Sequence, residues 1–133
     1  MRKIVTLLAA AGLLAGTAGL AHADPPLIIN HCSDVKTVAP SVTAKTCSHT
    51  QSRDTTYVQA YVDLTNKSVY PVTVRADLLV GDSVVPGVDI TVAPGQQNFV
   101  WGNAMQNPPC GEWCVGRGYL SSGGWSLYTY SNQ

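Results

Sequence analysis

Alternation of hydrophobic and polar side chains is clearest in the middle of the chain. Within residues 55 to 64, from position 57 onward, apolar side chains stand at the even positions and more polar ones at the odd positions. The two sets are Val58, Ala60, Val62 and Leu64, and Tyr57, Gln59, Tyr61 and Asp63. A period of two is typical of a half-buried β-strand. We therefore predict a strand here, with tyrosines on its outer face.

A second alternating segment follows after a short polar turn. Val72, Val74, Ala76 and Leu78 alternate with Thr73, Arg75 and Asp77. Residues 66–68, Asn-Lys-Ser, carry the side chains that favour turns. The pattern predicts that the two strands form an antiparallel hairpin.

The remaining segments are shorter. Turn residues at 81–83 and 93–95 flank an alternating run at 88–92, and strands are expected at 98–101 and 125–130. Two prolines predict a loop over 102–109, because proline donates no backbone hydrogen bond. Residues 24–54 show no sustained period. There we expect an edge strand at 27–30 and one helical turn at 33–38, ended by Pro40.

About six to eight short strands predict an all-β domain, either an antiparallel β-sandwich or a small barrel. Residues 61–92 run from a strand through an Asn-x-Ser turn, a second strand and a glycine turn into Ala-Pro-Gly. This stretch resembles the middle of many exported immunoglobulin-like sandwiches. The resemblance covers about a third of residues 24–133 and implies a fold but no function.

The N-terminus predicts export. Arg2 and Lys3 precede an apolar run, and Ala21-His22-Ala23 is a pattern that signal peptidase cuts. We expect residues 1–23 to be a cleaved signal peptide of bacterial style, and residues 24–133 to be a single secreted, extracellular domain. Removing Arg2 and Lys3 leaves six basic residues against eight acidic ones, a net charge of about −2. Such scattered charge argues against nucleic acid and membranes as partners, and we expect a monomer.

Four cysteines remain after the signal peptide, namely Cys32, Cys47, Cys110 and Cys114. An even number of cysteines in a short exported chain predicts two disulfides. We favour Cys32 with Cys47 and Cys110 with Cys114, the latter requiring a tight turn, because residues i and i+4 of a strand lie too far apart to pair. If that segment is extended instead, both of its cysteines must reach Cys32 and Cys47.

The Cys110–Cys114 segment is the main candidate for function. It holds Glu112, the only glutamate of the chain, and Trp113, and is followed by Arg117 and Tyr119. Trp, Tyr and Arg are frequent hot-spot residues, and a rigid loop loses little entropy on binding. We therefore expect a non-enzymatic module that binds or inhibits another secreted protein. The alternative is that Trp113 packs into the core and the turn only reverses the chain.

A carbohydrate or cell-surface binding module is the second possibility. Its stacking platform would be drawn from the aromatic residues Trp101, Trp113, Tyr119, Trp125, Tyr128 and Tyr130. Alternation places Tyr128 and Tyr130 on one face of the last strand. No catalytic site is predicted, since Gly81-Asp82-Ser83 is ordinary turn sequence. No cofactor is expected either. A Cys₂His₂ metal set including His31 and His49 is a weaker alternative, because exported thiols usually oxidise.

Overall fold

A computed structural model describes residues 25–121 and 125–129, with the side chain of Trp125 left out. The signal peptide expected at 1–23 lies outside these residues. The described chain forms eleven strands and one short 3₁₀-helix, in the following order: β1 (Leu27–Cys32), β2 (Lys36–Ala39), β3 (Val42–Ser52), β4 (Thr56–Asn66), β5 (Val72–Val80), β6 (Ser83–Val85), β7 (Ile90–Val92), β8 (Gln97–Trp101), β9 (Met105–Gln106), η1 (Gly111–Trp113), β10 (Val115–Leu120) and β11 (Trp125–Tyr128).

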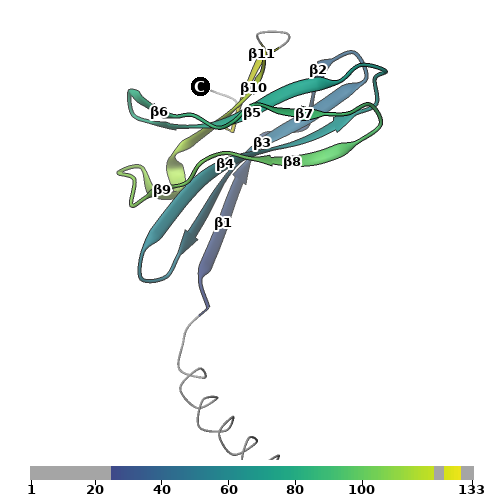
Figure 1. Cartoon of the computed structure of the whole chain (residues 1–133). Coiled ribbons are helices and arrows are strands. Elements are labelled where there is room, and N and C mark those ends of the chain that lie inside the picture. Colours follow the sequence, from purple (N-terminus) through teal and green to yellow (C-terminus); the bar gives the residue numbers. More distant parts are fainter. Residues whose placement is uncertain (1–24, 122–124, 130–133) are drawn as a thin grey trace, which may run out of the picture.

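The strands form two antiparallel sheets, which confirms the predicted β-sandwich (Figure 1). Sheet A has the order β1-β3-β4-β8, with β2 also paired to β3 and β9 to β4. Sheet B has the order β11-β10-β5-β6, with β7 also paired to β5. The described part contains more strands than the six to eight expected, because β6, β7 and β9 are only two or three residues long.

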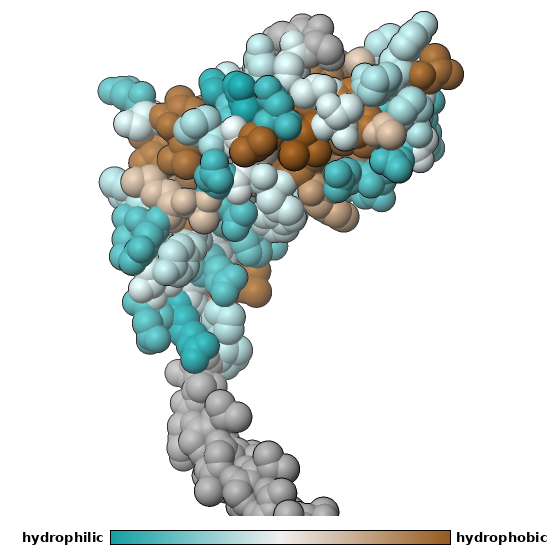
Figure 2. Space-filling view, viewed as in Figure 1, coloured by the Kyte–Doolittle hydropathy of each residue, from teal (hydrophilic) through white to brown (hydrophobic). Residues whose placement is uncertain are grey.

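The core lies between the two sheets and is built from the alternating segments. In β4 and β5 the predicted apolar faces point inward and are buried, namely Val58, Ala60, Val62, Leu64, Val72, Val74, Ala76 and Leu78. Their polar neighbours face outward, so the period of two correctly assigned both faces. Apolar side chains are also exposed in and between β6 and β7, namely Val84, Val88 and Ile90. Figure 2 shows several hydrophobic patches on the face of the molecule that it displays.

The predicted hairpin of β4 and β5 is wrong. β4 pairs with β3 and β8 in sheet A, whereas β5 pairs with β10, β6 and β7 in sheet B. Asn66 directs this change of layer, because its buried amide donates to the carbonyl oxygens of Tyr70 and Val92. Its Oδ1 accepts the backbone N–H of Ser68. Alternation shows which face of a strand is buried, but it does not show which strand is its neighbour.

The N-terminal region is more regular than its sequence suggests. An edge strand is present, as β1, and it pairs with β3. The helical turn expected at 33–38 is wrong, since Lys36–Ala39 is strand β2. β3 was not predicted, although it is eleven residues long. Its inward positions continue from Val42 and Ala44 into Thr46, Ser48 and Thr50, so small hydroxyl side chains hide the alternation.

Strand β10 was missed because glycine occupies two of its inward positions. A Cβ atom on Gly118 would collide with Thr46 Oγ1 and the side chain of Val62 in sheet A. One on Gly116 would press against the carbonyl oxygen of Cys47 and the side chain of Ala60. The two sheets therefore approach closely here, and glycine permits this approach.

The remaining turn and strand predictions are largely confirmed. Gly81 and Gly95 adopt positive φ angles of 60° and 79° within the two expected turns. β8 and β11 lie where strands were expected, although β11 is assigned only to Tyr128. The 102–109 loop contains the two-residue strand β9. Tyr130 lies outside the described residues.

Candidate functional site

Both disulfides join the cysteines that the favoured pairing joins. Cys32 in β1 lies directly opposite Cys47 in β3, so this bond ties an edge strand to its neighbour. Cys110 and Cys114 are four residues apart and close the turn that contains η1. With both pairs oxidised, the proposed Cys₂His₂ set has no thiolate to offer a metal.

The turn closed by Cys110–Cys114, called the ring turn below, has a defined backbone. Gly111 has a φ angle of 55°, in the left-handed region that favours glycine. The N–H of Gly111 donates to the carbonyl oxygen of Pro108, and that of Trp113 to Cys110, both at 3.0 Å. The Trp113 side chain is 62% exposed. It therefore lies on the surface rather than in the core.

His31 holds the ring turn against sheet A. Its imidazole stacks on the indole of Trp113, with the ring centroids 4.5 Å apart and the planes at 21°. Its Nε2–H donates to Glu112 Oε2 at 2.9 Å. Two neighbouring residues of the turn thus contact one histidine of β1. Sequence reasoning gave His31 no role at this site, because nothing in the local pattern places β1 beside residues 112–113.

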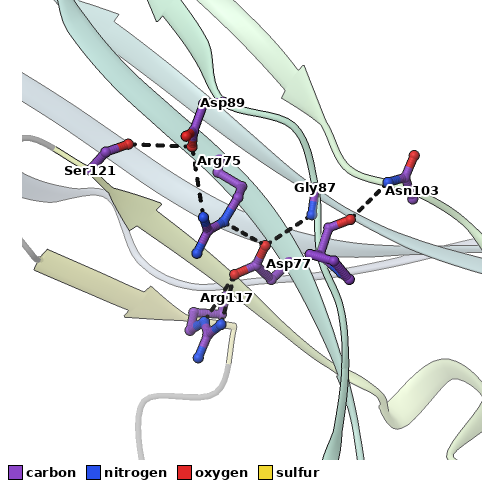
Figure 3. A network of polar contacts seen from close by, with 8 residues as sticks. Arg75, Asp77, Gly87, Asp89, Asn103, Arg117 and Ser121 are labelled. Atoms are coloured by element: carbon purple, nitrogen blue, oxygen red, sulfur yellow. Dashed lines mark hydrogen bonds and ion pairs between the residues drawn. The ribbon is translucent and has the colours of Figure 1, made fainter.

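The predicted residues Arg117 and Tyr119 lie elsewhere, on the outer face of sheet B. Figure 3 shows Arg117 beside Asp77 there. Arg117 Nη2 donates to Asp77 Oδ2 at 2.7 Å, and Arg75 Nε donates to Asp77 Oδ1 at 2.9 Å. The N–H of Gly87 adds a third contact at 3.0 Å. The Arg75 guanidinium lies 4.7 Å from the centre of the Tyr119 ring. These contacts form one network centred on Asp77, called the Asp77 network below.

Asp77 is a fully buried carboxylate whose partners compensate for its burial. Burial alone would raise its pKa, but the N–H of Gly87 and the guanidiniums of Arg117 and Arg75 bind the carboxylate and hold the pKa below its ordinary value. The hydrogen bond to Asp77, helped by one to Tyr128, raises the pKa of Arg117. Arg117, Tyr119 and Tyr128 therefore contact a structural ion pair rather than the ring turn.

A third group of side chains lies on the outer face of sheet A. Tyr61 and Trp101 are opposite each other on β4 and β8, and Asp63 is opposite Phe99. His49 meets the edge of Trp101, with the ring centroids 5.3 Å apart. Of the predicted carbohydrate platform, Trp101 belongs to this group. Tyr61 could have been added from the sequence, because it lies on the polar face of the clearest predicted strand.

The structure thus divides the described site residues among three places, and Trp101 alone of those predicted residues lies in the group on the outer face of sheet A. Glu112 and Trp113 are together in the ring turn, whereas Arg117, Tyr119 and Tyr128 surround the Asp77 network. Within residues 25–121 and 125–129, no group of three or more His, Cys, Asp or Glu residues could hold a metal ion. Over the same residues, no helix is long and apolar enough to cross a membrane.

Comparison with protein-family models, curated proteins and solved structures gave no match.

Proposed function

We propose that this protein is a small secreted, non-enzymatic binding module that uses the ring turn to contact another extracellular protein. The observation that carries the proposal is the exposure of Trp113 on a turn fixed by a disulfide and by His31. Export is supported by the expected signal peptide and by the two disulfides, which are typical of oxidising compartments.

The energetics of association favour such a turn. A flexible loop loses conformational freedom when it binds, at about 0.5–1.5 kcal/mol for each side chain that is immobilised. Here the indole already packs on His31, and Glu112 is already hydrogen-bonded. Much of this ordering is therefore complete before a partner arrives. An exposed tryptophan held in this way is typical of an interface hot spot.

The proposal can be tested by affinity capture from culture supernatant of the source organism. The wild-type protein, Trp113→Ala and Tyr70→Ala would each be immobilised and the retained proteins identified. Tyr70 is a matched control because it is a large aromatic residue, 72% exposed, in the loop between β4 and β5. We expect one protein to be retained by the wild type and by Tyr70→Ala but not by Trp113→Ala.

Thermal unfolding of the same three proteins provides the second readout. An exposed side chain contributes little to stability, so Trp113→Ala should keep the wild-type midpoint to within a few degrees. Capture by Trp113→Ala at the wild-type level would contradict the proposal. So would a large fall in the unfolding midpoint, because Trp113 would then be a structural residue.

A further inference from the structure

The outer face of sheet A contains an aromatic hollow that the ring turn does not explain. It is lined by Asn30, His49, Tyr61, Phe99 and Trp101 and has a volume of about 360 Å³. The centroid of the Tyr61 ring lies 4.5 Å from that of the Trp101 ring and 6.1 Å from that of the Phe99 ring. Phe99 is 52% exposed and Trp101 is 46% exposed. Exposed rings packed side by side on a sheet face provide a flat apolar surface.

Polar groups with fixed orientation stand at two sides of these rings. His49 Nδ1–H donates to Asn30 Oδ1 at 2.8 Å, which leaves the Asn30 amide N–H groups as donors and His49 Nε2 as an acceptor. Burial lowers the pKa of His49, which favours the neutral ring that this acceptor requires. Beside Phe99, Gln97 Nε2 donates to Asp63 Oδ1 at 2.8 Å.

The Cys32–Cys47 disulfide keeps the first of these polar pairs in place. Asn30 lies opposite His49, and Cys32 lies opposite Cys47 two residues further along the same two strands. The covalent bond therefore fixes the register in which Asn30 reaches His49. β1 pairs with β3 alone in sheet A, so the disulfide adds a covalent link to this single strand pairing.

We propose that this aromatic hollow binds a neutral saccharide. A sugar ring has an apolar C–H face that can pack on an aromatic ring, and hydroxyl groups around its edge that need adjacent donors and acceptors. The hollow combines both features, with rings at its centre and the Asn30–His49 pair at its edge. Its volume is near the lower end of the roughly 300–1,000 Å³ typical of small-ligand sites, which fits one or two sugar residues.

Other occupants fit these five residues less well. An anionic ligand would need a cation, and none of the five is cationic while His49 is neutral. A quaternary ammonium ion prefers rings that surround it. Here the planes of the Tyr61 and Trp101 rings are inclined by only 34° and the rings contact each other, so they form a surface rather than an enclosing cage.

The test is an NMR titration of the isotope-labelled protein with cellotetraose, chitotetraose and mannotetraose, each up to millimolar concentration, and with choline chloride. We expect at least one saccharide to shift the indole N–H signal of Trp101 and the amide signals of residues 30, 49, 61 and 99. Trp101→Ala should weaken this binding roughly tenfold, equivalent to the loss of one aromatic stacking contact.

Three control variants make the outcome specific. Tyr57→Ala removes an exposed tyrosine from the same face of β4 but outside the hollow, and it should bind saccharide like the wild type. Phe99→Ala provides a second loss-of-binding variant if Trp101→Ala does not fold. Trp113→Ala should also bind saccharide normally, so that failure of this inference and failure of the proposed protein-binding function can be told apart.

The inference is overturned if none of the three saccharides causes shifts in the hollow. It is equally overturned if Trp101→Ala and Phe99→Ala bind as the wild type does. Shifts at the same residues with choline chloride but with no saccharide would identify the hollow as a site for cations instead.

Discussion

The outer faces of the two sheets differ in what their side chains already contact. On sheet B, the charged residues meet one another, and the buried carboxylate of Asp77 binds two arginines and a backbone N–H. On sheet A and the adjoining ring turn, Trp101, Phe99 and Trp113 remain about half exposed or more. The charges of sheet B are thus compensated within the domain, whereas the aromatic surfaces beside sheet A are exposed, and these are the surfaces that we propose for binding.

Asp77→Asn should give the largest loss of stability and leave capture by the ring turn intact. Asparagine keeps the shape but removes the charge that compensates two guanidiniums. Because Arg75 and Arg117 are about a quarter exposed, we expect a loss of roughly 2–4 kcal/mol in the free energy of unfolding, measured with denaturant. Asp89→Asn is the control, since Asp89 is half exposed and 3.9 Å from Arg75. An equal effect of both variants would contradict this assignment.

Acid should weaken the same network. Since the pKa of Asp77 is lower in the folded protein than in the unfolded chain, its stabilising contribution is complete above the unfolded value near pH 4. That contribution is lost as the pH falls through the folded pKa. The stability difference between wild type and Asp77→Asn, measured by denaturation at a series of pH values, should thus be constant from pH 7 to about 5 and shrink below about 4. A difference that grew in acid would refute the assignment.

Removing each disulfide separates its role in stability from its role in binding. The double variant Cys32→Ala/Cys47→Ala opens the longer loop and should cost about 3 kcal/mol, whereas Cys110→Ala/Cys114→Ala should cost about 1 kcal/mol less. Denaturant unfolding measures both. The first variant should also weaken saccharide binding, because it frees Asn30 from its position opposite His49. The second variant should weaken protein capture but leave saccharide binding unchanged. Loss of saccharide binding in the second variant, with wild-type saccharide binding in the first, would contradict these roles.

His31→Ala is expected to have the smallest effect on stability, about 1 kcal/mol or less, because its partner Glu112 is about a third exposed and Trp113, on which it stacks, is exposed. Capture of the protein partner should nevertheless fall about tenfold, since Trp113 and Glu112 lose the ring that orders them. His49→Ala is the matched control, because it removes a histidine from the other aromatic surface. Unchanged capture by His31→Ala would show that the turn does not need this support.

The sequence predicted the parts of this structure that depend on local pattern. Strong alternation located β4 and β5, and turn residues located the chain reversals at Gly81 and Gly95. Strand partners could not be predicted, because the buried amide of Asn66 sends the chain into the second sheet through contacts distant in sequence. β3 and β10 were missed because threonine, serine and glycine occupy inward positions where apolar residues were expected.

The candidate site was predictable only in part, for a similar reason. The cysteine spacing indicated a closed turn that presents Trp113, and the structure contains it. His31 and His49 belong to strands whose pairing with distant segments cannot be read from the chain. Arg117 and Tyr119 are close to the turn in sequence, but they lie on the outer face of sheet B, because β10 leads away from the turn into that sheet.

Amide hydrogen exchange of the protein with and without its captured partner shows where that partner binds. If it binds through the ring turn, exchange should slow at residues 110–115 and in β1 beside them, while residues 73–77 and 117–119 on sheet B stay unchanged. Slowing confined to those sheet B residues, with the ring turn unaffected, would contradict binding through the ring turn.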